Sequence, residues 1–256
     1  MLVGIDTHAG YGPIDVAAFK AGGGRFIWAK CTQGNEHFVD DQFVHTVRAC
    51  RKYDVPVGTY HYAYCLPDHP DHPGRSPEEE AERAFDGCDG LGSQSGDLVP
   101  VVDAEHPTTP EKAAEFGCTR PQISDWLRRY CVHANKLWRR KPAIYTFPAW
   151  WRWLSSGADV SWSREYLSWW ADYGWPHDGP PPDGWTPPHA SWSTWDDWAV
   201  CQFSAEGSTA RVPGVNACPV DRDCIRSETM LLRLRGLWQP GDPDFDTVHP
   251  MPEHDS

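Results

Sequence analysis

The sequence predicts an α/β fold, namely an irregular TIM-like (β/α) barrel with about eight strands and fewer helices. Short apolar runs alternate with segments of helical periodicity, which is typical of parallel βα units. About eight such runs are present, enough to close a barrel. The back half shows few clear helical segments, so we expect the barrel to be irregular there.

The front half of the chain alternates regularly between strand and helix patterns. Its predicted strands are LVGID (2–6), RFIWAK (25–30), VPVGTYHYAY (55–64) and LVPVVDAE (98–105). Helices are predicted at 13–24, 40–53, 76–85 and 120–137. The third helix has the strongest start signals, because Ser76 can cap it, Pro77 takes the first position and Glu79 completes a capping box.

The back half contains strands but few helical patterns. The predicted strands are PAIYTF (142–147), YLSWWADY (166–173) and WAVCQF (198–203), with a last strand region ending in PVDRDC (219–224). Prolines and glycines predict a loop over 174–197. We expect one catalytic barrel over residues 1–238 and a disordered, acidic, proline-rich tail over 239–256.

The composition argues against some functions. A formal net charge of -13 disfavours binding to duplex nucleic acid and to anionic membranes. The 15 tryptophans suit sugar contacts and core packing equally well. No apolar stretch approaches the roughly 20 residues of a membrane span, and the N-terminus lacks a signal-peptide pattern. We therefore expect synthesis in the cytoplasm, with release by another agent if the protein acts outside the cell.

The nine cysteines include no C-x-x-C pair, which disfavours a zinc knuckle. Because the number is odd, at least one cysteine is unpaired. Small buried hydrophobic residues in a reduced compartment are the favoured interpretation. A disulfide between Cys218 and Cys224 is the alternative.

Carboxylates follow several of the predicted strands. The first strand ends at Asp6, the fourth ends in Asp103 and Glu105, and the last strand region ends in Asp221 and Asp223. Parallel barrels carry their catalytic groups at the carboxyl ends of the strands, so these side chains are expected to meet at one mouth. Like charges in a partly dry pocket must raise the pKa of at least one of these carboxyl groups. A general acid requires such a raised pKa, because it must be protonated near neutral pH.

Seven short motifs, in this order, resemble a single family. They are GIDTHAG, IDVAAFKAGGGRFIWAKCTQG, VGTYHYAY, VVDAE, PAIYTFPAWW, WWADY and AVCQFSAEGSTARVPGVNACPVDRD, and they cover about residues 2–224. Together they are similar to the glycoside hydrolase family 25 lysozymes, the Chalaropsis-type muramidases. The resemblance implies cleavage of the β-1,4 bond between N-acetylmuramic acid and N-acetylglucosamine in peptidoglycan, with no metal and no other cofactor.

The resemblance also implies roles for individual residues. Glu105 would be the general acid, and Asp103 would be its partner, orienting the 2-acetamido group of the substrate or steadying positive charge. Asp6 and Asp221 would complete the catalytic cluster. The residues that would line the sugar cleft and bind substrate are Tyr60, Tyr62, Tyr145, Tyr173 and Lys30.

Three positions depart from the family pattern. Gln33 stands where the Lys-Ala-Thr-Glu-Gly motif has Glu, and Cys201 stands where the Trp-Gln-Tyr motif has Trp. Asp223 stands where the closing Val-Asp-x-Asn motif has Asn. Because Asp103 and Glu105 are unaffected, we expect these changes to alter details of substrate recognition and to leave catalysis intact.

Two functions of other classes remain open. His61, His69, His72 and His106 would allow a metal-dependent polysaccharide deacetylase, but the sequence has no H-E-x-x-H motif and no third ligand at a convincing spacing. Solvated loop histidines are therefore the favoured interpretation. A non-catalytic cell-wall-binding module is the second alternative, although no internal repeats support it.

The expected partner is bacterial peptidoglycan, bound by a monomer that neither binds nucleic acid nor inserts into a membrane. A phage endolysin, made in the host cytoplasm and acting on the cell wall after release, fits these expectations. The stereochemical outcome is open, because carboxyl separations of ~5–5.5 Å favour retention and ~6.5–9.5 Å favour inversion. By the resemblance, we prefer retention assisted by the substrate's acetamido group.

Overall fold

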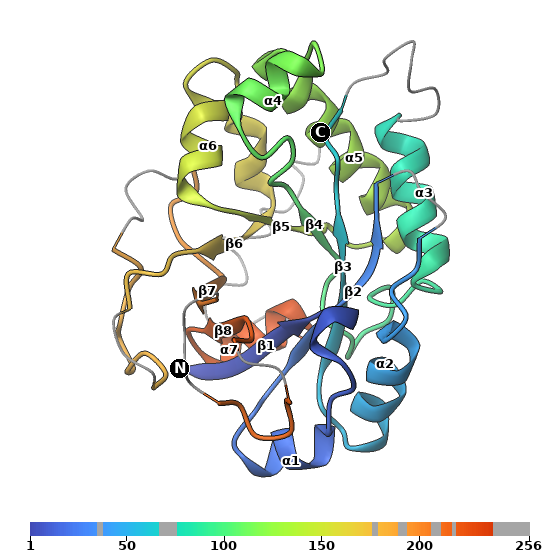
Figure 1. Cartoon of the computed structure of the whole chain (residues 1–256), viewed down its shortest axis with the longest axis vertical. Coiled ribbons are helices and arrows are strands. Elements are labelled where there is room, and N and C mark those ends of the chain that lie inside the picture. The colour runs from blue at the N-terminus through green and yellow to red at the C-terminus, as the bar shows by residue number, and fades with distance from the viewer. Residues whose placement is uncertain are drawn as a thin grey trace, which may run out of the picture.

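The computed structural model describes residues 1–34, 38–66, 76–175, 179–188, 194–205, 211–216 and 219–237. Its eight strands form one closed barrel in chain order (Figure 1). They are β1 (Leu2–Thr7), β2 (Ile27–Gln33), β3 (Val57–Tyr62), β4 (Val101–Asp103), β5 (Ala143–Thr146), β6 (Leu167–Ala171), β7 (Val200–Ser204) and β8 (Arg222–Ile225). The predicted α/β barrel with about eight strands is confirmed.

The direction of the last strand differs from the prediction. Strands β1 to β7 pair in parallel, whereas β8 runs antiparallel to both β7 and β1. The placement of Asp221 and Asp223 at the end of the last strand is therefore wrong, because Asp221 precedes β8 and Asp223 lies within it. Since the reversed strand begins where its parallel neighbours end, Asp221 still reaches the same mouth as Asp6.

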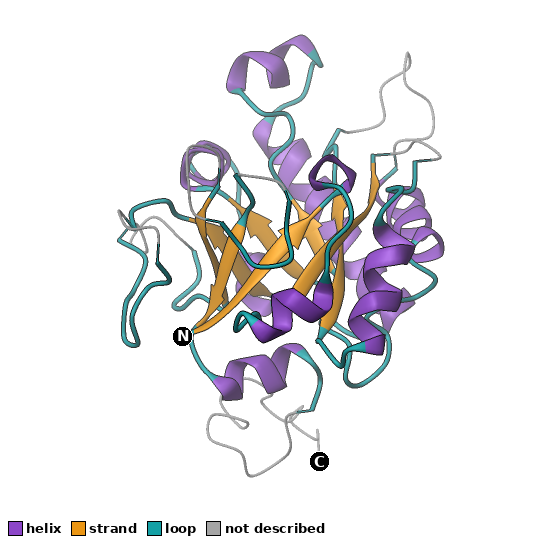
Figure 2. Cartoon of the chain, turned by 60° about the horizontal axis from the view of Figure 1, so that its bottom comes forward, coloured by secondary structure: helices purple, strands orange, loops and turns teal. Residues whose placement is uncertain are grey.

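Helices surround the outside of the barrel (Figure 2). In the described residues they are α1 (Val16–Ala21), α2 (Phe43–Lys52), α3 (Pro77–Gly87), α4 (Pro110–Glu115), α5 (Arg120–Trp138), α6 (Pro148–Ser155) and α7 (Glu228–Leu234), with the 3-10 helices η1 (Ala9–Tyr11) and η2 (Ser161–Glu165). The four helices predicted in the front half are confirmed as α1, α2, α3 and α5. Periodicity does not reveal α4, α6 and α7, because each spans only about two turns.

Side-chain caps show why two of the long helices begin where they do. The Ser76 hydroxyl accepts a hydrogen bond of 3.2 Å from the backbone N–H of Glu79 at the start of α3. Thr119 and Gln122 form a reciprocal capping box at the start of α5. Each cap satisfies an N–H group that has no partner within the first turn of the helix.

Tryptophans fill the barrel interior beneath its open end. Trp28 of β2 and Trp169 of β6 are buried, with ring centroids 4.8 Å apart. Gly58 of β3 provides the space for them, because a Cβ there would lie 2.5 Å from Nε1 of Trp28. Trp126 and Trp151 pack in a second apolar layer between strands and outer helices. Core packing therefore explains much of the tryptophan content.

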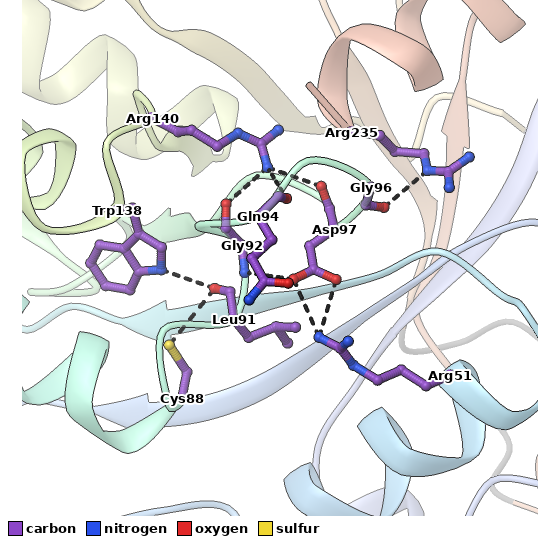
Figure 3. A network of polar contacts seen from close by, with 10 residues as sticks. All are labelled: Arg51, Cys88, Leu91, Gly92, Gln94, Gly96, Asp97, Trp138, Arg140 and Arg235. Carbon is purple, nitrogen blue, oxygen red and sulfur yellow. Dashed lines mark hydrogen bonds and ion pairs between the residues drawn. The ribbon is translucent and has the colours of Figure 1, made fainter. Parts of the chain in front are cut away.

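The segment 88–97, which leads from α3 to β4, lies at the end of the barrel opposite the pocket, and Figure 3 shows its polar contacts. The guanidinium of Arg140 donates hydrogen bonds to the backbone carbonyls of Gly92, Asp97 and Leu234 at 2.8, 3.0 and 2.9 Å. One side chain thus ties this segment to α7. The barrel has a fixed floor, and its open end is left for function.

The cysteines of the described residues are free thiols, and all except Cys118 are buried. They pack as the small hydrophobic residues that the sequence indicates. Cys218 and the tail over 239–256 lie outside the described residues, so the alternative disulfide and the predicted disorder stay predictions. In the described ranges, no helix combines the length and apolar character that a membrane crossing requires.

Candidate active site

A pocket of about 610 Å³ opens where the parallel strands end. It is lined by residues from β1 to β7 and from the segments after β4 and before β8, namely Asp6, Lys30, Tyr60, Tyr62, Val101, Asp103, Glu105, Tyr145, Trp169, Gln202 and Asp221. The structure thus brings together the four carboxylates predicted to be catalytic and four of the five residues predicted to bind substrate. The fifth, Tyr173, lies beside the pocket, with 56% of its surface exposed.

Strand β4 positions the first two carboxylates. Alternation along the strand turns Asp103 toward the barrel interior, and it is 8% exposed. The backbone keeps its extended pairing one residue further, because the N–H of Ala104 donates to the carbonyl of Tyr145 at 2.9 Å. Glu105, two residues after Asp103, therefore reaches the same pocket.

Burial gives these two carboxyl groups unusual proton affinities. It raises the pKa of Glu105 to about 7, with a further increase from the charge of Asp221 and an opposing effect of Lys30. Burial and the charge of Glu105 also raise the pKa of Asp103. No described residue donates a hydrogen bond to the buried Oδ1 of Asp103. The pocket thus pairs a carboxyl group that is partly protonated near neutral pH with a second carboxyl group that is more deeply buried.

Asp6, near the end of β1, is held by an amide from β7, which only β8 separates from β1. Nε2 of Gln202 donates a hydrogen bond of 2.7 Å to Oδ2 of Asp6. The amide oxygen of Gln202 accepts hydrogen bonds from the hydroxyls of Tyr145 at 3.0 Å and Tyr173 at 2.6 Å. These two donors fix which end of the amide faces Asp6.

Asp221 is held by a residue from the first loop. The hydroxyl of Tyr11 donates a hydrogen bond of 2.9 Å to Oδ2 of Asp221. The ring of Tyr11 packs on the ring of His8, with centroids 4.2 Å apart. The loop after β1 thus fixes a carboxylate that enters the barrel more than 200 residues later.

Lys30 is the one basic side chain among the lining residues. Its ammonium group donates a hydrogen bond of 2.8 Å to the neutral side chain of Gln33 and lies 5.2 Å from the centre of the Tyr62 ring. Burial lowers the pKa of Lys30, and the charges of Asp103, Asp40 and Glu105 oppose that effect. Gln33 carries no charge and therefore does not neutralise Lys30. The positive charge of Lys30 thus acts on the carboxylates of the pocket.

Three residues of the site have no role in the sequence predictions. Gln202 and Trp169 are the central residues of β7 and β6 and point inward, so strand alternation was the available signal. Tyr11 ends the 3-10 helix η1, which is too short for periodicity to give a signal.

The histidines do not form a metal site in the described part of the chain, where no group of three potential ligands occurs. The prediction of a solvated loop is wrong for His61, a residue of β3 that is 3% exposed. Its ring nitrogens form hydrogen bonds with Thr32 at 2.8 Å and with Glu80 of α3 at 2.9 Å. This burial arises because the residue faces the layer between strands and helices.

Of the other histidines of that prediction, His106 lies within the described residues. His106 is half-buried, and its ring packs near those of Tyr62, Tyr64 and Phe116. His69 and His72 lie outside the described residues. The described histidines therefore act in packing and hydrogen bonding.

Comparison with known proteins matches this geometry to one family. The sequence profile of glycosyl hydrolases family 25 matches residues 5–212. An N,O-diacetylmuramidase from Arthroderma benhamiae is 26% identical over 206 residues, which are 76% of this chain and 81% of that protein.

Solved structures show the same similarity. The bacterial lysozyme from Streptomyces coelicolor superposes with a TM-score of 0.71 at 25% identity, covering 92% of this chain and 96% of that one. A family GH25 lysozyme from Aspergillus fumigatus shares the fold, with a TM-score of 0.67 at 21% identity over 91% of this chain and 98% of that one. Since the profile match extends from β1 past β7, the chain belongs to glycosyl hydrolases family 25 and is a glycoside hydrolase.

Proposed function

We propose that this enzyme is a peptidoglycan N-acetylmuramidase, a lysozyme that cleaves the β-1,4 bond between N-acetylmuramic acid and N-acetylglucosamine. One observation carries the proposal: Glu105, with its pKa raised to about 7, shares a pocket with the buried Asp103. Similarity to proteins named as a muramidase and a bacterial lysozyme supports the same substrate.

Glu105 in its protonated form donates its proton to the glycosidic oxygen as the bond to the anomeric carbon breaks. A pKa near 7 suits this step, because the acid is then protonated in a useful fraction and still transfers its proton readily. The ionised form of Glu105 can afterwards accept a proton from the incoming water.

Asp103 acts on the other side of the same bond. Its carboxyl group lines the pocket, where it can accept a hydrogen bond from the N–H of a 2-acetamido group. Such a bond directs the acetamido oxygen toward the anomeric carbon. The negative charge of Asp103 also stabilises the positive charge that develops on the sugar ring.

The remaining lining residues contact the substrate and set the charge of the pocket. Tyr60, Tyr62 and Tyr145 offer aromatic surface to sugar faces, and Lys30 offers a cation to anionic groups of the polymer. Asp6 and Asp221 keep the pocket acidic. Asp6 accepts a hydrogen bond from Gln202, and Asp221 accepts one from Tyr11.

The stereochemical proposal is retention, with the acetamido oxygen as the internal nucleophile. Proton NMR of the first product, recorded before mutarotation, distinguishes the outcomes. A β anomer at early times is expected, and an α anomer at early times would show inversion.

The decisive experiment is mass spectrometry of fragments released from purified peptidoglycan. Fragments with N-acetylmuramic acid at the reducing end are expected, and a chelator should leave their yield unchanged. Release of acetate without new reducing ends would identify a deacetylase. Binding to peptidoglycan without any release would identify a wall-binding module.

We further propose that the enzyme is a monomer and acts on the cell wall outside the compartment in which it is made, as an endolysin would. Its substrate supports this proposal, because peptidoglycan lies outside the cytoplasmic membrane. Sedimentation of the pure protein tests whether it is a monomer. Comparing lysis by protein added outside bacteria with lysis by protein made inside them tests the route to the cell wall.

A further inference from the structure

Asp223 is a carboxyl group buried directly beneath the pocket. It lies in β8, is 0% exposed, and is the register partner of Gly4 in β1 and of Gln202 in β7. Alternation along the strand turns it to the same side as Asp221, toward the barrel interior. The family pattern quoted above has Asn at this position, which is neutral and can donate a hydrogen bond.

The contacts of Asp223 leave one of its two carboxyl oxygens without a donor. Its Oδ1 accepts a hydrogen bond of 3.0 Å from Nε1 of Trp169. Its Oδ2 is buried, and no N–H or O–H group of a described residue donates to it. Asp6 lies two residues beyond Gly4, the register partner of Asp223, so the two carboxyl groups are diagonal neighbours on the same face of the β1–β8 pair. Two neighbouring carboxyl groups can form a hydrogen bond only when one of them carries a proton.

The surroundings decide which of the two carries it. Burial and the charge of Asp221 raise the pKa of Asp6, but the hydrogen bond of 2.7 Å that Asp6 accepts from Gln202 favours its ionised form. Asp223 is the more deeply buried, and the charges acting on it from β1 and from its own segment are those of Asp6 and Asp221. Burial and both charges raise the pKa of Asp223.

The other ionisable groups near Asp223 face away from it. Arg222, the preceding residue, is turned to the outer side of β8, where its guanidinium donates to Ser204 and lies 5.0 Å from the centre of the Phe203 ring. The thiols of Cys224 on β8 and Cys201 on β7 contact each other on that same outer side. None of these groups neutralises a charge on Asp223.

We propose that Asp223 stays protonated in the folded enzyme and donates its O–H to Asp6, which keeps Asp6 ionised and fixed in the pocket. Asp223 is thus a positioning residue that replaces an amide by a neutral carboxylic acid. Its effect on hydrolysis rests on the function proposed above, whereas its protonation state does not.

The protonation state is tested without any substrate, by thermal unfolding between pH 4 and pH 8. An Asp has a pKa of about 3.9 in the unfolded chain, so a proton retained on Asp223 makes the wild type lose stability as the pH rises. Asp223→Asn removes this loss, so the Tm of the variant minus that of the wild type should increase steadily with pH. A difference that stays constant from pH 5 to pH 8 would show an ionised Asp223 and overturn the proposal.

Glu165→Gln is the matched control for loss of one carboxylate. Glu165 lies on the surface in an ion pair of 3.1 Å with Lys141, and its side chain is 67% exposed. Its Tm difference from the wild type should not vary over this pH range. A slope equal to that of Asp223→Asn would assign the effect to net charge and also overturn the proposal.

Hydrolysis then tests the donation to Asp6, by comparing Asp223→Asn with Asp223→Leu. Both variants remove the carboxyl group, but only Asn can donate to Asp6. Reducing-end release by the Leu variant should fall tenfold or more below that of the Asn variant, provided that its Tm shows a folded protein. Equal rates would refute the positioning role. An inactive wild type would instead refute the proposed function and leave the Tm result standing.

Discussion

The side-chain amide of Gln202 donates a hydrogen bond of 2.7 Å to Oδ2 of Asp6, across 196 residues of sequence. Because two tyrosine hydroxyls occupy the amide oxygen, the donor end cannot turn away from Asp6. Gln202→Leu removes this donor, and a charge-assisted bond of about 1.5–3 kcal/mol predicts a roughly 10- to 100-fold lower kcat/KM. Tyr173→Phe removes one of the two hydroxyls and should cost less. Wild-type kinetics in Gln202→Leu would contradict this arrangement.

Glu105→Gln should abolish hydrolysis while leaving the fold intact. Loss of a general acid lowers rates by about 10²- to 10⁴-fold, and Gln preserves the size of the side chain. The measurement is reducing-end release from peptidoglycan, with circular dichroism to verify the fold. Glu165→Gln, a surface change, is the control and should keep full activity. A fully active Glu105→Gln would remove Glu105 from the mechanism.

Activity should fall as the pH rises through about 7, because the pKa of Glu105 is about 7 and the acid must be protonated to act. Lys30 lowers that pKa, so Lys30→Met should move the alkaline limb of kcat/KM to higher pH, by roughly half a unit or more. Lys30→Arg keeps the charge and should leave the limb near its wild-type position. An unmoved limb in Lys30→Met would show that the pair does not interact.

The folded protein should be more stable at pH 5 than at pH 7.5. The pKa of Glu105 is raised to about 7 from a usual value near 4.5, so the native state binds more protons than the unfolded chain between these values. Stability is therefore greatest below that window and is lost as the pH rises, by roughly 3 kcal/mol for this group. Urea unfolding across this range measures the loss, and Glu105→Gln should make the curve flatter. Stability that increases toward pH 7.5 would be inconsistent with a raised pKa.

Arg140→Met should reduce stability without altering the chemistry. The change removes hydrogen bonds to the backbone carbonyls of Gly92, Asp97 and Leu234, at the end of the barrel opposite the pocket (Figure 3). We expect a loss of about 2–4 kcal/mol in the free energy of unfolding. The specific activity of the folded fraction should stay at the wild-type value. A selective loss of activity at unchanged stability would show coupling between the floor and the pocket.

The barrel follows from local signals in the sequence. Runs such as Val101 and Val102 mark strands that are covered on both faces, and Ser76 marks a helix start that the structure confirms. The reversed direction of β8 has no such signal, because a four-residue strand reads alike in both directions. Its orientation depends on closing the gap between β7 and β1.

The position of a site residue could be predicted from the sequence where a reactive side chain follows directly at the end of a strand. Asp6, Asp103 and Glu105 could be placed in one pocket for that reason. The role of Gln202 could not be predicted, because it depends on which side chains of β1 and β7 meet in the folded barrel. His61 was misjudged on the same ground, since its burial depends on Glu80 from a helix that begins later in the chain.

The antiparallel direction of β8 makes part of the charge in the pocket depend on strand register. Asp221 and Asp223 point inward, and Arg222 between them points outward. Sliding this strand by a single position would exchange the two groups of side chains and put a guanidinium where the acids now stand. One residue inserted or deleted just ahead of Arg222 would thus replace an acid of the pocket by a cation, while Asp6, Asp103 and Glu105 would stay in place.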